Sequence, residues 1–353
     1  MRKNSTVSTI KRSSVSKLET SGAAAVAVLL LLMIEPAAVM ASMQRSLSLC
    51  AGTVVPSLFP FLAASELLVR SGAGERIATR LARPICRLFG VSRCGAVAYV
   101  MGLLCGFPVG ARTAAAYAAR GKIKQEELTH LLCFCNVPSA AFLINAVGVS
   151  LYGDAAFGRL LPCVAVLSAA LCGILYRLIF RPSTRVGRRQ ADEGLVTLRT
   201  EANSRADTSL GASLAAAAGG MISVVATVLF FGAVLGALRA LLARLQASGI
   251  LCLSEESGLL LSSLLACFFE LTGGVASAAA LRGVTSARLC ALSPLLCAAA
   301  VGWGGLSVLC QLLAVCGDLR SRIRLGRFFL ARGLQAVLCC LGVMLTVALL
   351  GWK

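Results

Sequence analysis

The sequence predicts an all-α polytopic membrane protein with two inverted-topology repeats, each containing a re-entrant hairpin and a broken transmembrane helix. Three observations support this prediction. The 353 residues are 58% hydrophobic and 14% charged, whereas a soluble domain has roughly 25% charged residues. Gly/Pro interruptions fall at matching places in two halves of the chain. The Lys and Arg residues gather in a few segments between apolar runs.

Apolar windows long enough to cross a bilayer, about 20 residues each, set the expected order of elements. They begin near Gly22, Cys50, Leu128, Phe157, Ala212, Leu289 and Phe328. Two further runs, residues 95–119 and 258–281, are interrupted by turn residues, and we expect them to form the re-entrant hairpins. Residues 1–20 are basic and lack an apolar core, so we expect a cytoplasmic basic tail followed by an uncleaved anchor.

Four parts follow from this order. After the tail (1–20) comes an N-terminal membrane repeat with an extra first helix (21–180). A hydrophilic cytoplasmic linker (181–211) then leads to a C-terminal membrane repeat (212–353).

The positive charges orient this arrangement. If neither interrupted run crosses the membrane, residues 1–20, 70–93, 112–127, 177–205 and 318–332 face the cytoplasm and hold 27 of the 34 Lys and Arg residues. Full crossings would largely remove this asymmetry, which positive-inside orientation produces. We therefore predict a multi-pass membrane protein with a cytoplasmic N-terminus, and hairpins that return to the side they entered from.

Residues 74–93, GERIATRLARPICRLFGVSR, alternate apolar side chains at helical spacing with arginines. Such a basic amphipathic helix is typical of the cytoplasmic membrane surface, where anionic lipids attract it. We expect Pro84 to bend it.

The two halves align without a gap at an offset of 164 positions, which pairs residues 106–142 with 270–306 and gives nine identities. Lipid cannot satisfy free backbone N–H and C=O groups, so broken backbone at membrane depth must line a wet cavity or be buried in protein. We expect GFPVGA and ELTGG to form hairpin tips, and NVPS and VGWGG to mark broken helices. The alternative is that these Gly and Pro residues only allow close packing or kinks.

Polar groups within the spans complete the predicted solute site, because an ionisable side chain in a membrane is costly and usually functional or paired. Glu270 could bind a proton, a cation or a solute, or cap the hairpin. Arg112 could meet Glu270 or anchor the hairpin in the cytoplasm, and Glu66 fits a snorkelling or salt-bridged role. The predicted solute-binding residues are Gly106, Pro108, Gly110, Asn136, Pro138, Glu270, Thr272, Gly273, Gly274, Gly304, Gly305 and Gln311.

The sequence contains no nucleophile elbow, Walker A sequence or paired metal ligands. We therefore expect neither an enzyme nor a metal site, and no cofactor apart from a coupling ion, H⁺ or Na⁺. The net charge of +19 is accounted for by membrane orientation, so we expect the lipid bilayer and a small polar solute as partners, and no nucleic acid. A homo-oligomer is left open.

Several motifs, in order, resemble the YlbJ-type sporulation integral membrane proteins: VVPSLFPFLAASELL (54–68), GLLCGFPVGART (102–113), FCNVPSAAF (134–142), ELTGG (270–274) and WGGLSVLCQ (303–311). That family is similar to a wider group with the nucleoside-recognition or Gate domain, found in concentrative nucleoside transporters and the iron transporter FeoB. The chain departs from the family at Gly273, where an Asn is common.

The resemblance implies a protein of the bacterial cytoplasmic membrane that takes part in endospore formation, linked to spore cortex assembly, in the forespore or mother-cell envelope. It leaves two functions open, a transporter or permease of a small polar solute and a non-transporting membrane scaffold for spore envelope assembly. Fold alone does not decide between them.

Overall fold

The computed structural model describes residues 22–181 and 209–350, and the regular elements in both ranges are helical. The first range contains α2 (Pro36–Leu49), η1 (Cys50–Val54), α3 (Val55–Arg70), α4 (Ala73–Phe89), α5 (Arg93–Cys105), α6 (Val109–Ala119), α7 (Gln125–Phe134), η2 (Phe142–Leu151) and α8 (Ala155–Phe180). The second contains α10 (Leu210–Ala247), α11 (Glu255–Phe269), α12 (Leu271–Ala280), η3 (Leu281–Gly283), α13 (Ala287–Trp303), α14 (Gly305–Cys316), η4 (Gly317–Arg322) and α15 (Leu325–Leu350). The predicted tail and most of the predicted linker lie outside the described residues.

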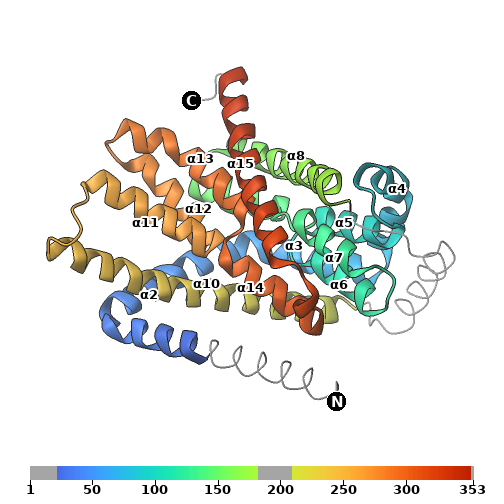
Figure 1. Ribbon diagram of the computed structural model, residues 1–353, viewed down its shortest axis with the longest axis horizontal. Coiled ribbons are helices and arrows are strands. Elements are labelled where there is room, and N and C mark those ends of the chain that lie inside the picture. Colours follow the sequence, from blue (N-terminus) through green and yellow to red (C-terminus); the bar gives the residue numbers. More distant parts are fainter. Residues whose placement is uncertain (1–21, 182–208, 351–353) are drawn as a thin grey trace, which may run out of the picture.

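Most of these helices run along the long axis of the molecule, and α15 crosses them (Figure 1). Five helical runs are long and apolar enough to span a membrane: Pro36–Arg70, Ala155–Phe180, Leu210–Ala247, Ala287–Arg322 and Leu325–Leu349. The pair α4 and α5, bent by 106°, is a sixth candidate. The prediction of an all-α, multi-pass membrane protein is confirmed for the described residues.

The N-terminal region is divided differently from the prediction. A short apolar helix, Gly22–Ile34, ends before Glu35, and one helical run then continues from Pro36 to Arg70. The first helix therefore begins at Gly22 as predicted but is short, and the second helical run begins at Pro36 rather than near Cys50. Pro36 explains the position of the break, because proline fits the first turn of a helix but lacks the N–H that a preceding helix would need.

Helix α4 has the expected amphipathic character. It buries the small side chains of Ala78 and Ala82, and exposes the larger Ile77, Leu81 and Leu88. Leaving large apolar side chains outside the packed face favours a helix whose outer surface meets lipid.

Each half of the chain contains two breaks in its helices, at the places that the sequence predicts. The first break separates α5 from α6 at residues 106–108, and the second separates α7 from η2 at residues 135–139. The third lies at Glu270, between α11 and α12, and the fourth at Gly304, between α13 and α14. At each break a few backbone groups leave the helical hydrogen-bond pattern and need other partners.

The hairpins of the two halves also pack alike. A Cβ atom added to Gly110 would lie 2.7 Å from the Cα atom of Gly102, and one added to Gly274 would lie 3.3 Å from the carbonyl oxygen of Ala266. Gly102 and Ala266 are 164 positions apart, as are Gly110 and Gly274. Gly110 and Gly274 therefore each pack closely against the backbone of the preceding helix, although the atom nearest to the Cβ added at Gly274 belongs to Cys267, the residue after Ala266.

Helix α10 packs along the run formed by α2 and α3. Glu35 forms an ion pair with Arg244, and the Ser42 hydroxyl donates to the carbonyl of Gly232 at 2.7 Å. Residue numbers rise along α2 as they fall along α10, so the two helices are antiparallel.

The close hairpin contacts predict how glycine substitutions affect stability. Gly110→Ala and Gly274→Ala each place a Cβ atom within 2.7 Å of a backbone atom, and such overpacking costs about 1–3 kcal/mol. Thermal unfolding of the purified protein in detergent is expected to show a lower midpoint for both. Gly219→Ala in α10 is the control, because no atom lies within 4 Å of its added Cβ. Equal midpoints for all three variants would contradict the described packing.

Candidate functional site

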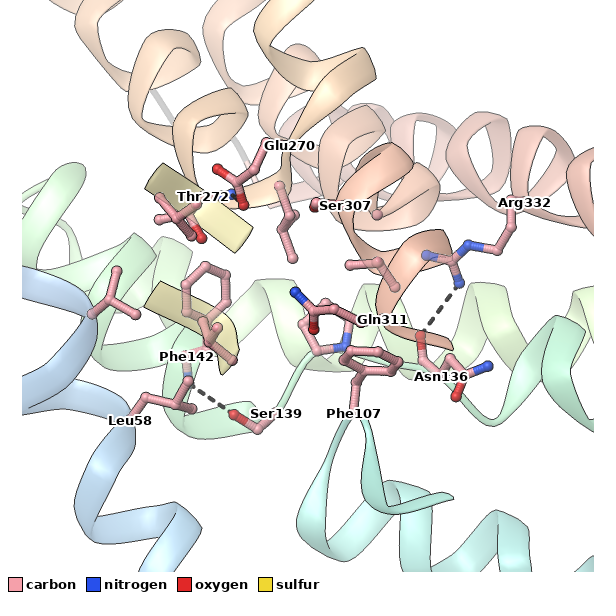
Figure 2. Close-up of a pocket in the computed structure, with 17 residues that line it drawn as sticks. Leu58, Phe107, Asn136, Ser139, Phe142, Glu270, Thr272, Ser307, Gln311 and Arg332 are labelled. Carbon is pink, nitrogen blue, oxygen red and sulfur yellow. Dashed lines mark hydrogen bonds between the residues drawn. The ribbon is translucent and has the colours of Figure 1, made fainter. Parts of the chain in front are cut away.

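The four breaks meet around one cavity, here called the central cavity. Its walls come from Phe107 at the first break, residues 136–142 at the second, residues 270–272 at the third and residues 304–311 at the fourth. Residues of η1, α3 and α10 close one side, and Arg332 of α15 closes another. Figure 2 shows the labelled side chains converging from helices of both halves.

The structure brings half of the predicted solute-binding residues to this cavity. Asn136, Pro138, Glu270, Thr272, Gly304 and Gln311 line it. The other predicted residues, Gly106, Pro108, Gly110, Gly273, Gly274 and Gly305, are not part of its lining.

Two of these glycines allow one break to pack closely against another. A Cβ at Gly106 would lie 2.6 Å from the Cβ of Ser139, and a Cβ at Gly305 would lie 2.9 Å from the Cα of Glu270. Both glycines have positive φ, +74° and +78°, a conformation that glycine adopts without steric cost. In each half, therefore, the hairpin tip rests directly against the break of the following helix.

Glu270 is buried, with 4% of its surface exposed, and it caps the N-terminus of α12. Its Oε1 atom accepts the backbone N–H of Thr272 at 2.8 Å, and its Oε2 atom accepts that of Gly273. The capping role that the sequence left open is present, and the residue also lines the central cavity. The positive end of the α12 dipole stabilises the charged form of this carboxylate.

Arg332 is the charged residue of the site that sequence analysis missed, and Ser139 and Ser307 are polar residues of the lining that it also missed. Arg332 lies in α15 with 2% of its surface exposed. Its Nε donates to the carbonyl of Trp303 at 3.0 Å, and its Nη1 donates to the carbonyl of Asn136 at 3.3 Å and to Oε1 of Gln335 at 2.6 Å. One guanidinium thus satisfies backbone carbonyls at the ends of α7 and α13, one from each half.

The sequence analysis counted Arg332 among the orienting charges of residues 318–332, whereas the structure buries it beside the central cavity. The signal that could have identified it is its place inside an apolar run, RFFLARGLQAVL, because a charge there is costly unless it is paired.

The remaining polar groups of the cavity differ in whether they already form hydrogen bonds within the protein. The Asn136 amide nitrogen donates to the carbonyl of Leu132 at 2.7 Å, and the Ser139 hydroxyl accepts the N–H of Phe142 at 3.3 Å. Gln311 lies in the middle of the group in Figure 2. Its amide forms no hydrogen bond within the described residues, so it is the polar group most available to a solute.

Arg112 does not meet Glu270. It pairs instead with Glu66, whose Oε1 lies 3.2 Å from its Nη1, and Arg70 lies 4.0 Å from the same carboxylate. The salt-bridged role predicted for Glu66 is confirmed, and the suggested contact between Arg112 and Glu270 is wrong. Spacing along the sequence could not distinguish these partners, because both carboxylates are distant from Arg112 in the chain.

The central cavity is small in this conformation, about 70 Å³. For comparison, an engineered cavity of about 150 Å³ binds benzene. The space fits a few water molecules or a small ion, and a nucleoside would require it to widen. Within residues 22–181 and 209–350, no group of three or more His, Cys, Asp or Glu residues is placed to hold a metal ion.

Comparison with known proteins identifies a relative of most of the chain. The sporulation integral membrane protein YlbJ of Bacillus subtilis (strain 168) is 28% identical over 328 residues, which cover 88% of this chain and 78% of the relative. No family model matches the chain, and no solved structure matches it. The motifs quoted above lie within a likeness that spans nearly the whole sequence. This likeness supports assignment of the chain to the YlbJ-type sporulation integral membrane proteins.

Proposed function

We propose that the chain is a secondary transporter or permease of a small polar solute, and that its site is the central cavity. The observation that carries this proposal is the convergence of four helix breaks, two from each half, on one cavity, whose mostly apolar walls carry a few polar side chains. Discontinuous helices that meet at the repeat interface form the solute sites of many transporters. The proposal requires no chemistry on the solute and no resident cofactor.

We further propose that the two halves are inverted repeats with re-entrant hairpins, as in Gate-type transporters. Helices α5, α6, α11 and α12 have 13, 11, 15 and 10 residues, fewer than the about 20 that a crossing needs. The matched contacts of Gly110 and Gly274 support a common origin of the two hairpins. The distribution of Lys and Arg supports entry from opposite sides.

In the proposed mechanism, the two hairpins move against the remaining helices and open the central cavity to one side at a time. Glu270 binds the coupling ion, H⁺ or Na⁺, and Gln311 hydrogen-bonds the solute. Binding of a cation by Glu270 competes with the backbone N–H groups of Thr272 and Gly273. Occupancy of the carboxylate is thereby linked to the stability of the third break.

The relative's name refers to sporulation, and we propose that this chain serves spore formation, with a link to the cortex. The alternative is a membrane scaffold for spore envelope assembly that transports nothing. The small size of the central cavity is the observation that favours this alternative.

The Gln311 amide gives the most direct test of solute binding. Gln311→Ala removes a hydrogen bond to the solute without removing one that the fold uses, and a net bond of about 1 kcal/mol corresponds to about fivefold weaker binding. A panel of nucleosides, amino acids and inorganic ions is screened by thermal stabilisation and by uptake into proteoliposomes. Gln246→Ala, at an exposed residue of α10, serves as the control and is expected to match the parent protein.

The scaffold alternative predicts that no solute binds and that Gln311→Ala leaves sporulation unchanged. If no member of the panel stabilises the protein or enters the proteoliposomes, and Gln311→Ala still supports sporulation, the transporter proposal fails.

Ion coupling is tested by Glu270→Gln, which keeps one acceptor oxygen for the α12 N-terminus but cannot bind a proton or Na⁺ as a carboxylate. Uptake driven by a pH or Na⁺ gradient is expected to fall to background, while exchange of solute for solute continues. Glu66→Gln, which alters a carboxylate outside the cavity, is expected to keep gradient-driven uptake. Gradient-driven uptake that survives Glu270→Gln would rule out this carboxylate as the coupling site.

A further inference from the structure

A second cavity, larger than the first, lies between α2, α10 and α12. Its volume is about 310 Å³. Glu270 borders both cavities, and Gly273, which was predicted as part of the solute site, lines only this second one. The transport proposal gives no role to this cavity.

Two arginines from facing helices line the second cavity: Arg45 from α2 and Arg239 from α10. Arg239 donates through Nη2 to the hydroxyl of Ser277 at 3.2 Å and to the carbonyl of Ser262 at 3.4 Å. Its Nε is buried without a hydrogen-bond partner. In the described part of the chain, neither arginine forms an ion pair, so two positive charges share one space with no acidic side chain bonded to them.

Among the described residues, Glu270 is the only carboxylate that lines the cavity, and it forms no ion pair with either arginine. Both oxygens of Glu270 accept backbone N–H groups of α12. Three serines, Ser42, Ser46 and Ser277, add hydroxyl groups to the walls. The cavity therefore combines guanidinium and hydroxyl donors, the groups that bind phosphate oxygens in proteins.

The position of Arg239 along α10 places the cavity near one membrane surface. From Leu210 to Arg239 an α-helix rises about 43 Å at about 1.5 Å per residue, which exceeds the about 30 Å of bilayer hydrocarbon. Arg239 is the first charged residue of α10, and Arg244, which pairs with Glu35, follows it. With Leu210 at one surface of the hydrocarbon layer, the guanidinium of Arg239 would lie level with the lipid phosphates of the opposite surface.

We propose that the second cavity binds a phosphate group through Arg45 and Arg239. The phosphate belongs either to an anionic phospholipid headgroup or to a soluble phosphate. Its charge balances the two guanidiniums, and its oxygens accept hydrogen bonds from Arg239 Nε and from the hydroxyls of Ser46 and Ser277, whereas the Ser42 hydroxyl already donates to the Gly232 carbonyl. An occupied cavity joins α2, α10 and the hairpin helix α12, so binding stabilises their packing.

The test uses the full-length protein in neutral detergent and measures thermal unfolding in two arms. One arm adds phosphatidylglycerol or phosphatidylcholine to the micelles, and the other adds inorganic phosphate or chloride at equal ionic strength. The variants are Arg239→Gln and Arg45→Gln. Arg288→Gln is the matched control, because Arg288 is an exposed arginine that does not line the cavity.

A lipid site predicts a higher midpoint with phosphatidylglycerol than with phosphatidylcholine, and a soluble phosphate site predicts a higher midpoint with inorganic phosphate than with chloride. In either case the apparent affinity is expected to fall about tenfold or more in Arg239→Gln and Arg45→Gln, as for the loss of a charged hydrogen bond, and to stay unchanged in Arg288→Gln. Arg45 is exposed, so its variant remains informative if Arg239→Gln fails to fold. Stabilisation by neither ligand, or stabilisation that both variants keep, overturns the proposal.

Discussion

Peptide groups released at helix breaks in apolar surroundings need partners from the protein itself, and the rest of this structure depends on that constraint. At the first break, the N–H of Phe107 donates to the carbonyl of Val137 at the second break, at 3.1 Å. At the third, the Glu270 carboxylate accepts two N–H groups of α12. At the second and fourth breaks, Arg332 donates to carbonyls of Asn136 and Trp303. The free backbone groups of each break are therefore hydrogen-bonded either to another break or to a side chain that lies beside it.

The two buried ionisable side chains of the central cavity contact helix ends rather than each other. Glu270 lies at the N-terminus of α12, where the helix dipole is positive. The guanidinium of Arg332, which projects from α15, donates to carbonyls at the C-terminal ends of α7 and α13, where the helix dipoles are negative. Because neither side chain uses the other as its partner, a solute or ion can enter between them without first breaking a salt bridge. This arrangement links the packing of the fold to the proposed transport role.

Sequence reasoning located the breaks because Gly and Pro interrupt helices through local conformational effects, and these residues are visible in the sequence itself. It also identified Glu270 and Asn136, which lie at breaks in apolar runs, and Gln311, a polar residue within an apolar run. It missed Arg332 because counting positive charges by segment treats every arginine as an orienting charge. It assigned Arg112 no definite partner, since the choice of Glu66 depends on tertiary contacts. The first helices are divided at Pro36. The effect of a single proline is lost when hydrophobicity is averaged over a window of apolar residues.

The most direct test of the central claim, that two like units enter the membrane from opposite sides, is the accessibility of their hairpin connections. Lys124→Cys follows the first hairpin, and Gly283→Cys follows the second at a position with open space around it. Both variants are made after the exposed Cys163, Cys252 and Cys310 are replaced by Ser, and are treated with a membrane-impermeant maleimide. The account predicts that intact cells label Gly283→Cys, and that Lys124→Cys is labelled only after the membrane is opened. Labelling of both positions from the same side would contradict it.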